Sequence, residues 1–217
     1  MKETPSQKNK PKLFGVGIND VEYNVKLYEE CPKVNGKRYQ KLIWICPFYR
    51  KWQDMITRCY SEKSYPTYAE CSVCEPWMRL SVFKAWMETQ DWEGKQLDKD
   101  LLISGNNVYS PETCLFVEPR VNIFLVEHDK RRGEYPIGVS HATKGELYRA
   151  QCKSVETGKN TNLGGYDTPE KAHQVWLDFK LKQAYILASQ QTDERVAKAL
   201  IERYENYKIN LDTTQFS

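Results

Sequence analysis

The chain has 217 residues, of which 40% are hydrophobic and 28% charged, a composition typical of a globular protein. Its apolar runs are far too short to span a bilayer, and its charged N-terminus lacks an apolar signal segment, so we expect an intracellular protein without a membrane role. The net charge of +3 equals the balance of the first twelve residues, which hold four lysines and one glutamate, so overall charge is weak evidence for a nucleic-acid partner.

The first 46 residues divide into a tail and a predicted hairpin. Residues 1–12 are polar, basic and interrupted by proline, which is typical of a disordered tail. Small turn residues lie between the apolar ones of residues 13–25, and residues 41–46 have the composition of a strand after the turn-prone pair Asn35-Gly36. These features predict a hairpin in this part of the chain.

Two amphipathic helices are predicted between residues 47 and 87. Apolar side chains recur at three- and four-residue steps after Pro47, which indicates a helix with one buried face. These side chains are Tyr49, Trp52, Met55, Ile56 and Cys59. A second helix over residues 76–87 has a similar face, formed by Trp77, Leu80, Phe83 and Met87. The aromatic stripe of the first helix is more typical of a core than of a surface that stacks on bases.

The seven cysteines are odd in number, and without a secretory context they argue against a disulfide framework. Only Cys71 and Cys74 form a CxxC pair, which is half of a tetrahedral zinc site. Cys59 and Cys114 lie in segments that should pack near this pair and are candidates to complete a structural zinc site. The alternative is that all four are buried free thiols that act as small hydrophobic side chains.

Residues 96–124 combine a strand, a polar loop, a second strand and the start of a helix. Residues 96–102 alternate polar and apolar side chains, so Asp98 and Asp100 are expected to share one face of a strand. Residues 104–111 are rich in turn formers, and residues 113–117 are predicted as the second strand. Pro119 then suits the first turn of a helix, which would carry Asn122 back towards Asp98.

The chain resembles a phage-type branch of the HNH, or ββα-metal, endonucleases in four sequence features. These are the segment LDKD (residues 97–100), Gly105, the segment YSPETC (residues 109–114) and Asn122. The WxxMxxRCY segment at residues 52–60 resembles the helix that precedes the metal core in that branch. The resemblance implies that Asp98 and Asn122 bind Mg²⁺ or Mn²⁺, for which oxygen ligands are suited.

Lys99 is where this chain departs from the HNH pattern. In that family the residue after the first metal ligand is the histidine that acts as general base, and Lys99 occupies its position. A lysine needs a strongly lowered pKa to accept a proton near neutrality, so Asp100 or a second water is the other candidate for this role. Without the resemblance, the two acids would simply flank a solvated strand and Asn122 would be an ordinary helix residue.

Residues 135–188 are predicted to form three short strands and a long helix, with Thr168 as N-cap and Pro169 in the first turn. Their order resembles the APETALA2-type DNA-binding domain, in which the outer face of the sheet lies in the major groove of DNA. The positions that match its DNA-contacting residues are His141, Arg149, Gln151, Lys153 and Asn162. Several arginines and a tryptophan of that family are absent, and the alternative is a solvated sheet face.

The sequence therefore predicts an α+β protein with a disordered tail (residues 1–12), an HNH-like domain (13–127), a linker (128–134), an APETALA2-like domain (135–190) and a C-terminal amphipathic helix and tail (191–217). The expected function is metal-dependent cleavage or nicking of double-stranded DNA by a chain that, if of phage origin, is located in the host cytoplasm. The sequence leaves the oligomeric state open and favours a monomer. The alternatives are a catalytically silent DNA-binding protein and a protein-interaction module.

Overall fold

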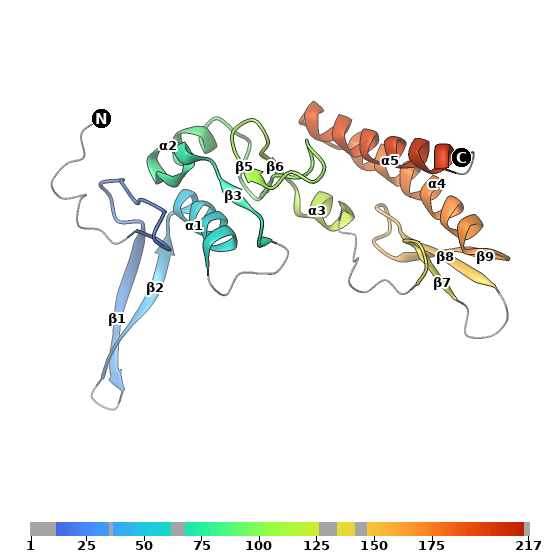
Figure 1. Ribbon diagram of the computed structural model, residues 1–217. Coiled ribbons are helices and arrows are strands. Elements are labelled where there is room, and N and C mark those ends of the chain that lie inside the picture. Colours follow the sequence, from blue (N-terminus) through green and yellow to red (C-terminus); the bar gives the residue numbers. More distant parts are fainter. Residues whose placement is uncertain (1–11, 35–36, 62–67, 126–133, 142–146, 215–217) are drawn as a thin grey trace. The chain divides into compact units, whose positions relative to one another are not determined.

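The structure is a computed structural model that describes residues 12–34, 37–61, 68–125, 134–141 and 147–214 (Figure 1). It shows a mixed α+β protein, as predicted, with several small sheets and helices. The contacts divide the chain into two compact units, Met1–Phe116 and Val117–Ser217. Within the described ranges, no helix is long and apolar enough to cross a membrane. The predicted tail lies almost wholly outside the described residues, as does most of the predicted linker.

A long antiparallel hairpin opens the regular structure of the first unit. Its strands are β1 (Lys26–Val34) and β2 (Lys37–Ile45), and they flank residues 35–36, which lie outside the described part of the chain. The segment before it forms only isolated bridges, of which Ile18 with Arg79 joins distant parts of the chain. The backbone of Cys46 closes the base of the hairpin by donating to the carbonyl of Val25 at 2.9 Å.

The core of the first unit lies around helix α1 (Pro47–Tyr60). Pro47 occupies the first turn, where its missing N–H costs nothing, and the buried face of the helix is the predicted one. Trp52 is fully buried, and its indole Nε1 donates to the carbonyl of Trp77 at 2.8 Å. Trp77 in turn packs edge-on against Phe83, with ring centroids 5.1 Å apart. These contacts join α1 to the two short helices η2 (Glu75–Met78) and α2 (Leu80–Met87).

Arg79 divides the single helix predicted over residues 76–87. Its backbone is extended, with φ −96° and ψ 126°. The cause is Ile18, whose amide donates to the carbonyl of Met78 at 2.7 Å and whose carbonyl accepts from the amide of Leu80 at 3.0 Å. Because Ile18 forms hydrogen bonds with the carbonyl of Met78 and the amide of Leu80, as a neighbouring strand would, the helix cannot continue through Arg79. The pairing joins residues about sixty positions apart, so no local pattern could predict the break.

Two short pairs of strands follow in the first unit. Strand β3 (Ser72–Val73) pairs in parallel with β5 (Val108–Tyr109), and β4 (Gln96–Asp98) pairs with β6 (Leu115–Val117). Both strands predicted around the polar loop are therefore present, in shorter form. Strand β5 was not expected, because its partner lies 36 residues earlier in the chain.

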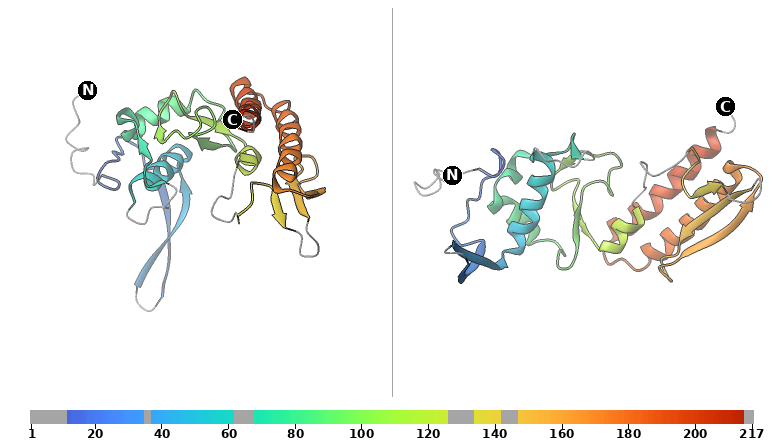
Figure 2. Two further views of the ribbon diagram at one scale, coloured as in Figure 1. Left: turned by 45° about the vertical axis from the view of Figure 1, so that its right-hand side comes forward. Right: turned by 90° about the horizontal axis from the view of Figure 1, so that it is seen from below.

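The second unit is built on a three-stranded antiparallel sheet in the order β7 (Val139–His141), β8 (Tyr148–Lys153), β9 (Asn160–Tyr166). Helix α4 (Pro169–Ala188) covers one face of this sheet, and α5 (Glu194–Thr214) packs against α4 (Figure 2). The helix begins as the sequence predicts, because the Thr168 hydroxyl accepts from the amide of Lys171 at 3.2 Å. This is the predicted order of three strands and one helix.

Helix α3 (Pro119–Leu125) packs with the long helices of the second unit. Lys180 on α4 donates to the carbonyl of Phe124 at 2.7 Å, and its ammonium lies 3.5 Å from the centre of the Phe124 ring. Tyr204 on α5 meets the same ring edge-on at 5.5 Å. The cation and the two rings therefore hold α3 against both helices.

Candidate nuclease site and nucleic-acid interface

Asp98 ends strand β4 with its own side chain. Its Oδ1 accepts from the amides of Asp100 and Leu101 at 2.9 and 2.7 Å. A side chain that binds the amides two and three residues ahead forms a turn and takes those amides away from a strand. The chain therefore leaves the strand at Asp98, and the expected alternation that would put Asp98 and Asp100 on one face stops there.

The carboxylate of Asp98 is desolvated, and only one of its two oxygens accepts hydrogen bonds from described residues. Burial raises its pKa above the usual 3.8, while the two turn amides act in the opposite direction and offset only part of this effect. Among the described residues, no donor bonds to its Oδ2. Perturbed carboxylate pKa values are common at functional sites and also occur in structural positions, so this shift does not by itself define a metal ligand. The role of Asp98 as a metal ligand stays a prediction.

Lys99 points inward rather than towards solvent, and only 5% of its surface is exposed. Its ammonium donates to the carboxylate of Asp100 and to the carbonyl of Asn106, the latter at 2.7 Å. Burial lowers the pKa of Lys99, but the hydrogen bond and the charge of Asp100 outweigh this effect and raise it. Lys99 is therefore protonated near neutrality, so it is placed to hold the loop or donate a proton, and not to accept one.

Asn106 completes the same loop from the other side. Its side-chain amide donates to the carbonyls of Lys99 and Val108, both at 2.8 Å, and its Oδ1 accepts from the amide of Val108 at 3.2 Å. Thr113 bonds to the carbonyl of Val108 at 2.8 Å as well. Lys99 and Thr113, which belong to the segments that carry the resemblance, thus help Asn106 to fix a loop. This role of Asn106 was not predicted from the sequence. The only signal was its place in a turn-rich segment.

Lys99→Met should lower the free energy of unfolding by about 2 kcal/mol. The substitution keeps an apolar stem but removes a charged donor from two acceptors, and hydrogen bonds to charged groups contribute roughly 1.5–3 kcal/mol each. The value is set low because Asp100 is half exposed and water can replace part of its bond. Urea unfolding measures the change.

Lys95→Met is the matched control for Lys99→Met. Its ammonium pairs with Asp91, whose side chain is 73% exposed, so the expected loss is below about 1 kcal/mol. Equal losses in the two variants would contradict a clamping role for Lys99. Loss of DNA cleavage in Lys99→Met with unchanged stability would instead assign proton transfer to Lys99.

Asn122 lies in α3, half-buried, on the helix that the sequence predicts for it. Asp98 belongs to the first unit and Asn122 to the second. The meeting of these two side chains around one cation stays a prediction.

The four cysteines proposed as zinc ligands lie near one another in two pairs. The charge of Cys71 contributes to the raised pKa of Cys59, and that of Cys74 to the raised pKa of Cys114, but burial is the main cause in both cases. The pKa of each buried thiol rises to about 12. No group of three His, Cys, Asp or Glu side chains that could hold a metal ion occurs in the described part of the chain. The structural zinc stays a prediction.

The uncovered face of the sheet brings together most of the predicted DNA-binding residues. Ala150 and Cys152 of β8 are buried on the side of α4, so the alternating residues lie on the other face. These residues are Arg149, Gln151 and Lys153, and the register places Asn162 of β9 opposite Gln151. Arg149 and Lys153 are exposed, and neither forms an ion pair with another described residue.

His141 differs from the other predicted DNA-binding residues. The register pairs it with Tyr148, on the side of the sheet that Ala150 shares, and its ring meets Tyr148 edge-on at 5.3 Å. Ser140, which the sequence analysis did not single out, pairs with Arg149 instead and lies on the uncovered face. Asn160 opposite Lys153 is a second such residue. The register of β7 and β9 could not be derived from spacing, because two loops separate the strands.

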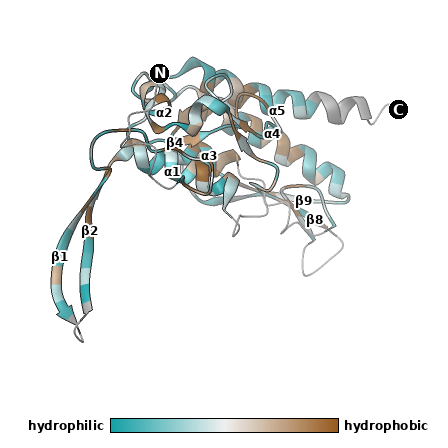
Figure 3. Cartoon of the chain, turned by 60° about the vertical axis from the view of Figure 1, so that its left-hand side comes forward, coloured by the Kyte–Doolittle hydropathy of each residue, from teal (hydrophilic) through white to brown (hydrophobic). Residues whose placement is uncertain are grey.

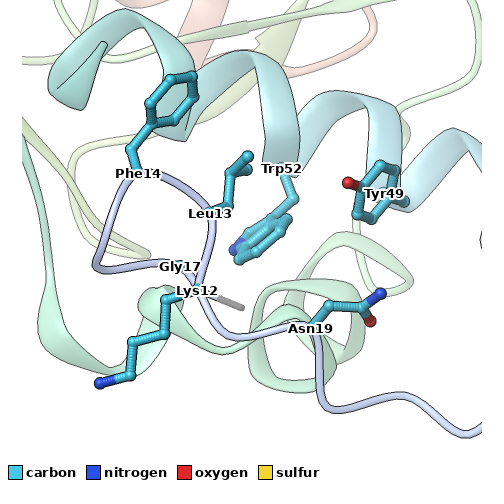
Figure 4. Close-up of a pocket in the computed structure, with 7 residues that line it drawn as sticks. All are labelled: Lys12, Leu13, Phe14, Gly17, Asn19, Tyr49 and Trp52. Carbon is cyan, nitrogen blue, oxygen red and sulfur yellow. The ribbon is translucent and has the colours of Figure 1, made fainter. Parts of the chain in front are cut away.

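A pocket of about 380 Å³ lies in the first unit (Figure 4). It opens between the segment that precedes β1 and helix α1. Its lining residues are Lys12, Leu13, Phe14, Gly17, Asn19, Tyr49 and Trp52. The ammonium of Lys26 lies 5.3 Å from the centre of the Tyr49 ring, so a cation borders this aromatic wall.

No protein-family model matches the chain, and neither curated proteins nor solved structures gave a match.

Proposed function

We propose that the chain is a divalent-metal-dependent DNA endonuclease, with an HNH-like core and an APETALA2-like module that binds double-stranded DNA. The observation that carries the proposal is the order of elements around Asp98. Strand β4 ends at Asp98 and pairs with β6, and α3, with Asn122 at its middle, begins two residues after β6. This is the strand, strand and helix sequence that a ββα-metal core requires.

The residues fit Mg²⁺ or Mn²⁺ in this role. Asp98 supplies a carboxylate oxygen with no donor among the described residues, and Asn122 supplies an amide oxygen, both of which suit these cations. A bound cation would supply Lewis-acid stabilisation of the charge that develops on the phosphate. Asp98 contributes its negative charge to this site, and the two turn amides orient it. Asp100, paired with Lys99 and half exposed, is the acid placed nearest to assist a water.

A catalytically silent DNA-binding protein is the second candidate. The observation that favours it is Lys99, because a protonated, buried lysine stands where the related nucleases have a basic histidine. Such a protein would keep the fold and the sheet surface and cut nothing.

Incubation of the full chain with supercoiled plasmid and Mg²⁺ or Mn²⁺ separates the two functions. Conversion to the nicked or linear form, abolished by EDTA, supports the nuclease. Binding of duplex DNA without any conversion supports the silent binder. Absence of both contradicts both and leaves a protein-interaction module.

Arg149→Ala combined with Lys153→Ala should weaken duplex binding and reduce its salt dependence. Each phosphate contact releases counterions, so losing two contacts should lower the slope of log affinity against log salt by about 2. Fluorescence anisotropy with a labelled duplex at several salt concentrations measures the slope. Ala substitution of His141, which lies on the side of Tyr148, is the matched variant and should leave the slope unchanged.

A further inference from the structure

The β1–β2 hairpin extends away from the rest of the first unit with both faces uncovered (Figures 1 and 3). All of its described side chains are exposed or half-buried, although paired side chains on its two strands point alternately to opposite faces. A two-stranded ribbon of this kind is at best marginally stable alone in water. A partner that covers it would therefore stabilise it.

The base of the hairpin exposes large apolar side chains. Five of them show between 41% and 56% of their surface, and they are Leu27, Tyr28, Leu42, Ile43 and Trp44. Leu27 pairs with Trp44 and Tyr28 with Leu42, so exposed apolar pairs occur on both faces near the base of the ribbon. Exposed apolar side chains that lie next to one another on a folded protein mark surfaces that meet a partner.

The charge of the hairpin indicates what kind of partner this is. Residues 26–45 contain five lysines and arginines and two glutamates, whereas residues 46–217 contain 23 basic and 24 acidic residues. The chain beyond its first twelve residues has no net charge, and within it this ribbon holds an excess of three positive charges. The exposed side chains of Lys33, Arg38 and Lys41 form no ion pair with any described residue. Unpaired cations on an exposed ribbon favour a polyanion and oppose association with a second, equally positive copy.

The dimensions of the hairpin match a groove of duplex DNA. Each strand has nine residues, which at about 3.3 Å per residue gives a ribbon roughly 30 Å long. The major groove is about 12 Å wide and admits a two-stranded ribbon. A ribbon of this length can lie in the groove across several base pairs.

We propose that the β1–β2 hairpin is a DNA-binding arm that lies in a groove of the duplex, separate from the sheet of the second unit. Lys33, Arg38 and Lys41 contact phosphates, and the apolar residues near its base contact sugars and base edges. This inference rests on the proposed function, because it takes double-stranded DNA as the ligand. It adds a second contact surface to the one that the resemblance implies.

The test compares two triple variants of the full chain in salt-dependent binding to a labelled duplex. Lys33→Ala/Arg38→Ala/Lys41→Ala should lower the slope of log affinity against log salt by up to about 3, or roughly 0.9 for each contact. Lys182→Ala/Arg195→Ala/Lys198→Ala removes three cations from α4 and α5 and should leave the slope unchanged. Duplex DNA should also slow trypsin cleavage after Lys33, Arg38 and Lys41 of the native chain more than cleavage after Arg195.

Each outcome either supports or overturns the proposed DNA-binding arm. A reduced slope in the hairpin variant alone, together with protection from trypsin, supports the arm. An unchanged slope with native-like binding overturns the arm and leaves the proposed function intact, whereas a native chain that binds no duplex overturns both. Dimers that form without DNA and are lost in Trp44→Ser would assign the hairpin to self-association and also overturn the arm.

Discussion

Asp98→Asn is expected to lower the rate of plasmid nicking in Mg²⁺ or Mn²⁺ by at least about 100-fold. Asparagine has nearly the same shape, and its oxygen can still accept from the amides of Asp100 and Leu101. What it lacks is the negative charge that holds a divalent cation. Metal-assisted stabilisation of a transition state is worth several kcal/mol, and each 1.36 kcal/mol corresponds to about a factor of ten in rate. Initial rates of conversion of supercoiled plasmid measure the effect.

The stability of Asp98→Asn shows whether lost activity reflects lost charge or lost folding. The pKa of Asp98 is raised in the folded chain by burial, so above that pKa the folded state holds a charge that the unfolded chain hydrates better. The native carboxylate therefore lowers stability at neutral pH, and Asp98→Asn should be the more stable protein in urea with EDTA. The difference should shrink as the pH falls through the raised pKa and vanish below 3.8, where both states are protonated.

Glu93→Gln is the matched control for the loss of nicking. It removes one exposed carboxylate from the same unit, five residues before Asp98, and should cut at the native rate. Unchanged nicking by Asp98→Asn would remove Asp98 from the metal site. Equal loss in both variants would point to charge in general and not to a ligand.

The sequence predicted the elements whose causes are local. Thr168 followed by Pro169 predicted the start of α4, and the spacing of Trp52, Met55 and Ile56 predicted the buried face of α1, because a cap and a helical period depend on near neighbours. The break at Arg79 could not be predicted. It depends on a backbone pairing with Ile18, which only the folded chain brings near.

The side-chain positions in the candidate site also depend on contacts that the sequence does not show. The sequence identified Asp98 through a resemblance, and the structure gives it a turn that ends its strand. The sequence could not show that Lys99 is buried and bonded to Asn106, because the loop between them has no regular period. Nor could it separate His141 from Arg149, since the face on which a residue of β7 lies depends on register with β8.

Gly138→Ala is expected to destabilise the second unit by about 3 kcal/mol or more. Gly138 has φ +80°, which costs an L-residue roughly 1–2 kcal/mol. A Cβ built there would also lie 2.0 Å from Cδ1 of Trp176, a ring that is 4% exposed and stacked on His173. His173 is itself bonded to the carbonyl of Ile137 at 2.8 Å, so the indole cannot move aside without disturbing that contact. Overpacking of this kind adds about 1–3 kcal/mol.

Gly158→Ala separates the backbone strain from the overpacking in this loss of stability. Gly158 has φ +67°, but nothing lies within 4 Å of a Cβ built there, so only the backbone strain remains. Urea unfolding, with hydrogen exchange of the β8 amides to report on the second unit, should therefore show a loss of about 1–2 kcal/mol for Gly158→Ala and a clearly larger loss for Gly138→Ala. Equal losses would mean that Trp176 yields to the added methyl group. Because Arg149 and Lys153 extend from β8, the larger loss should also weaken duplex binding, whereas Gly158→Ala should bind as the native chain does.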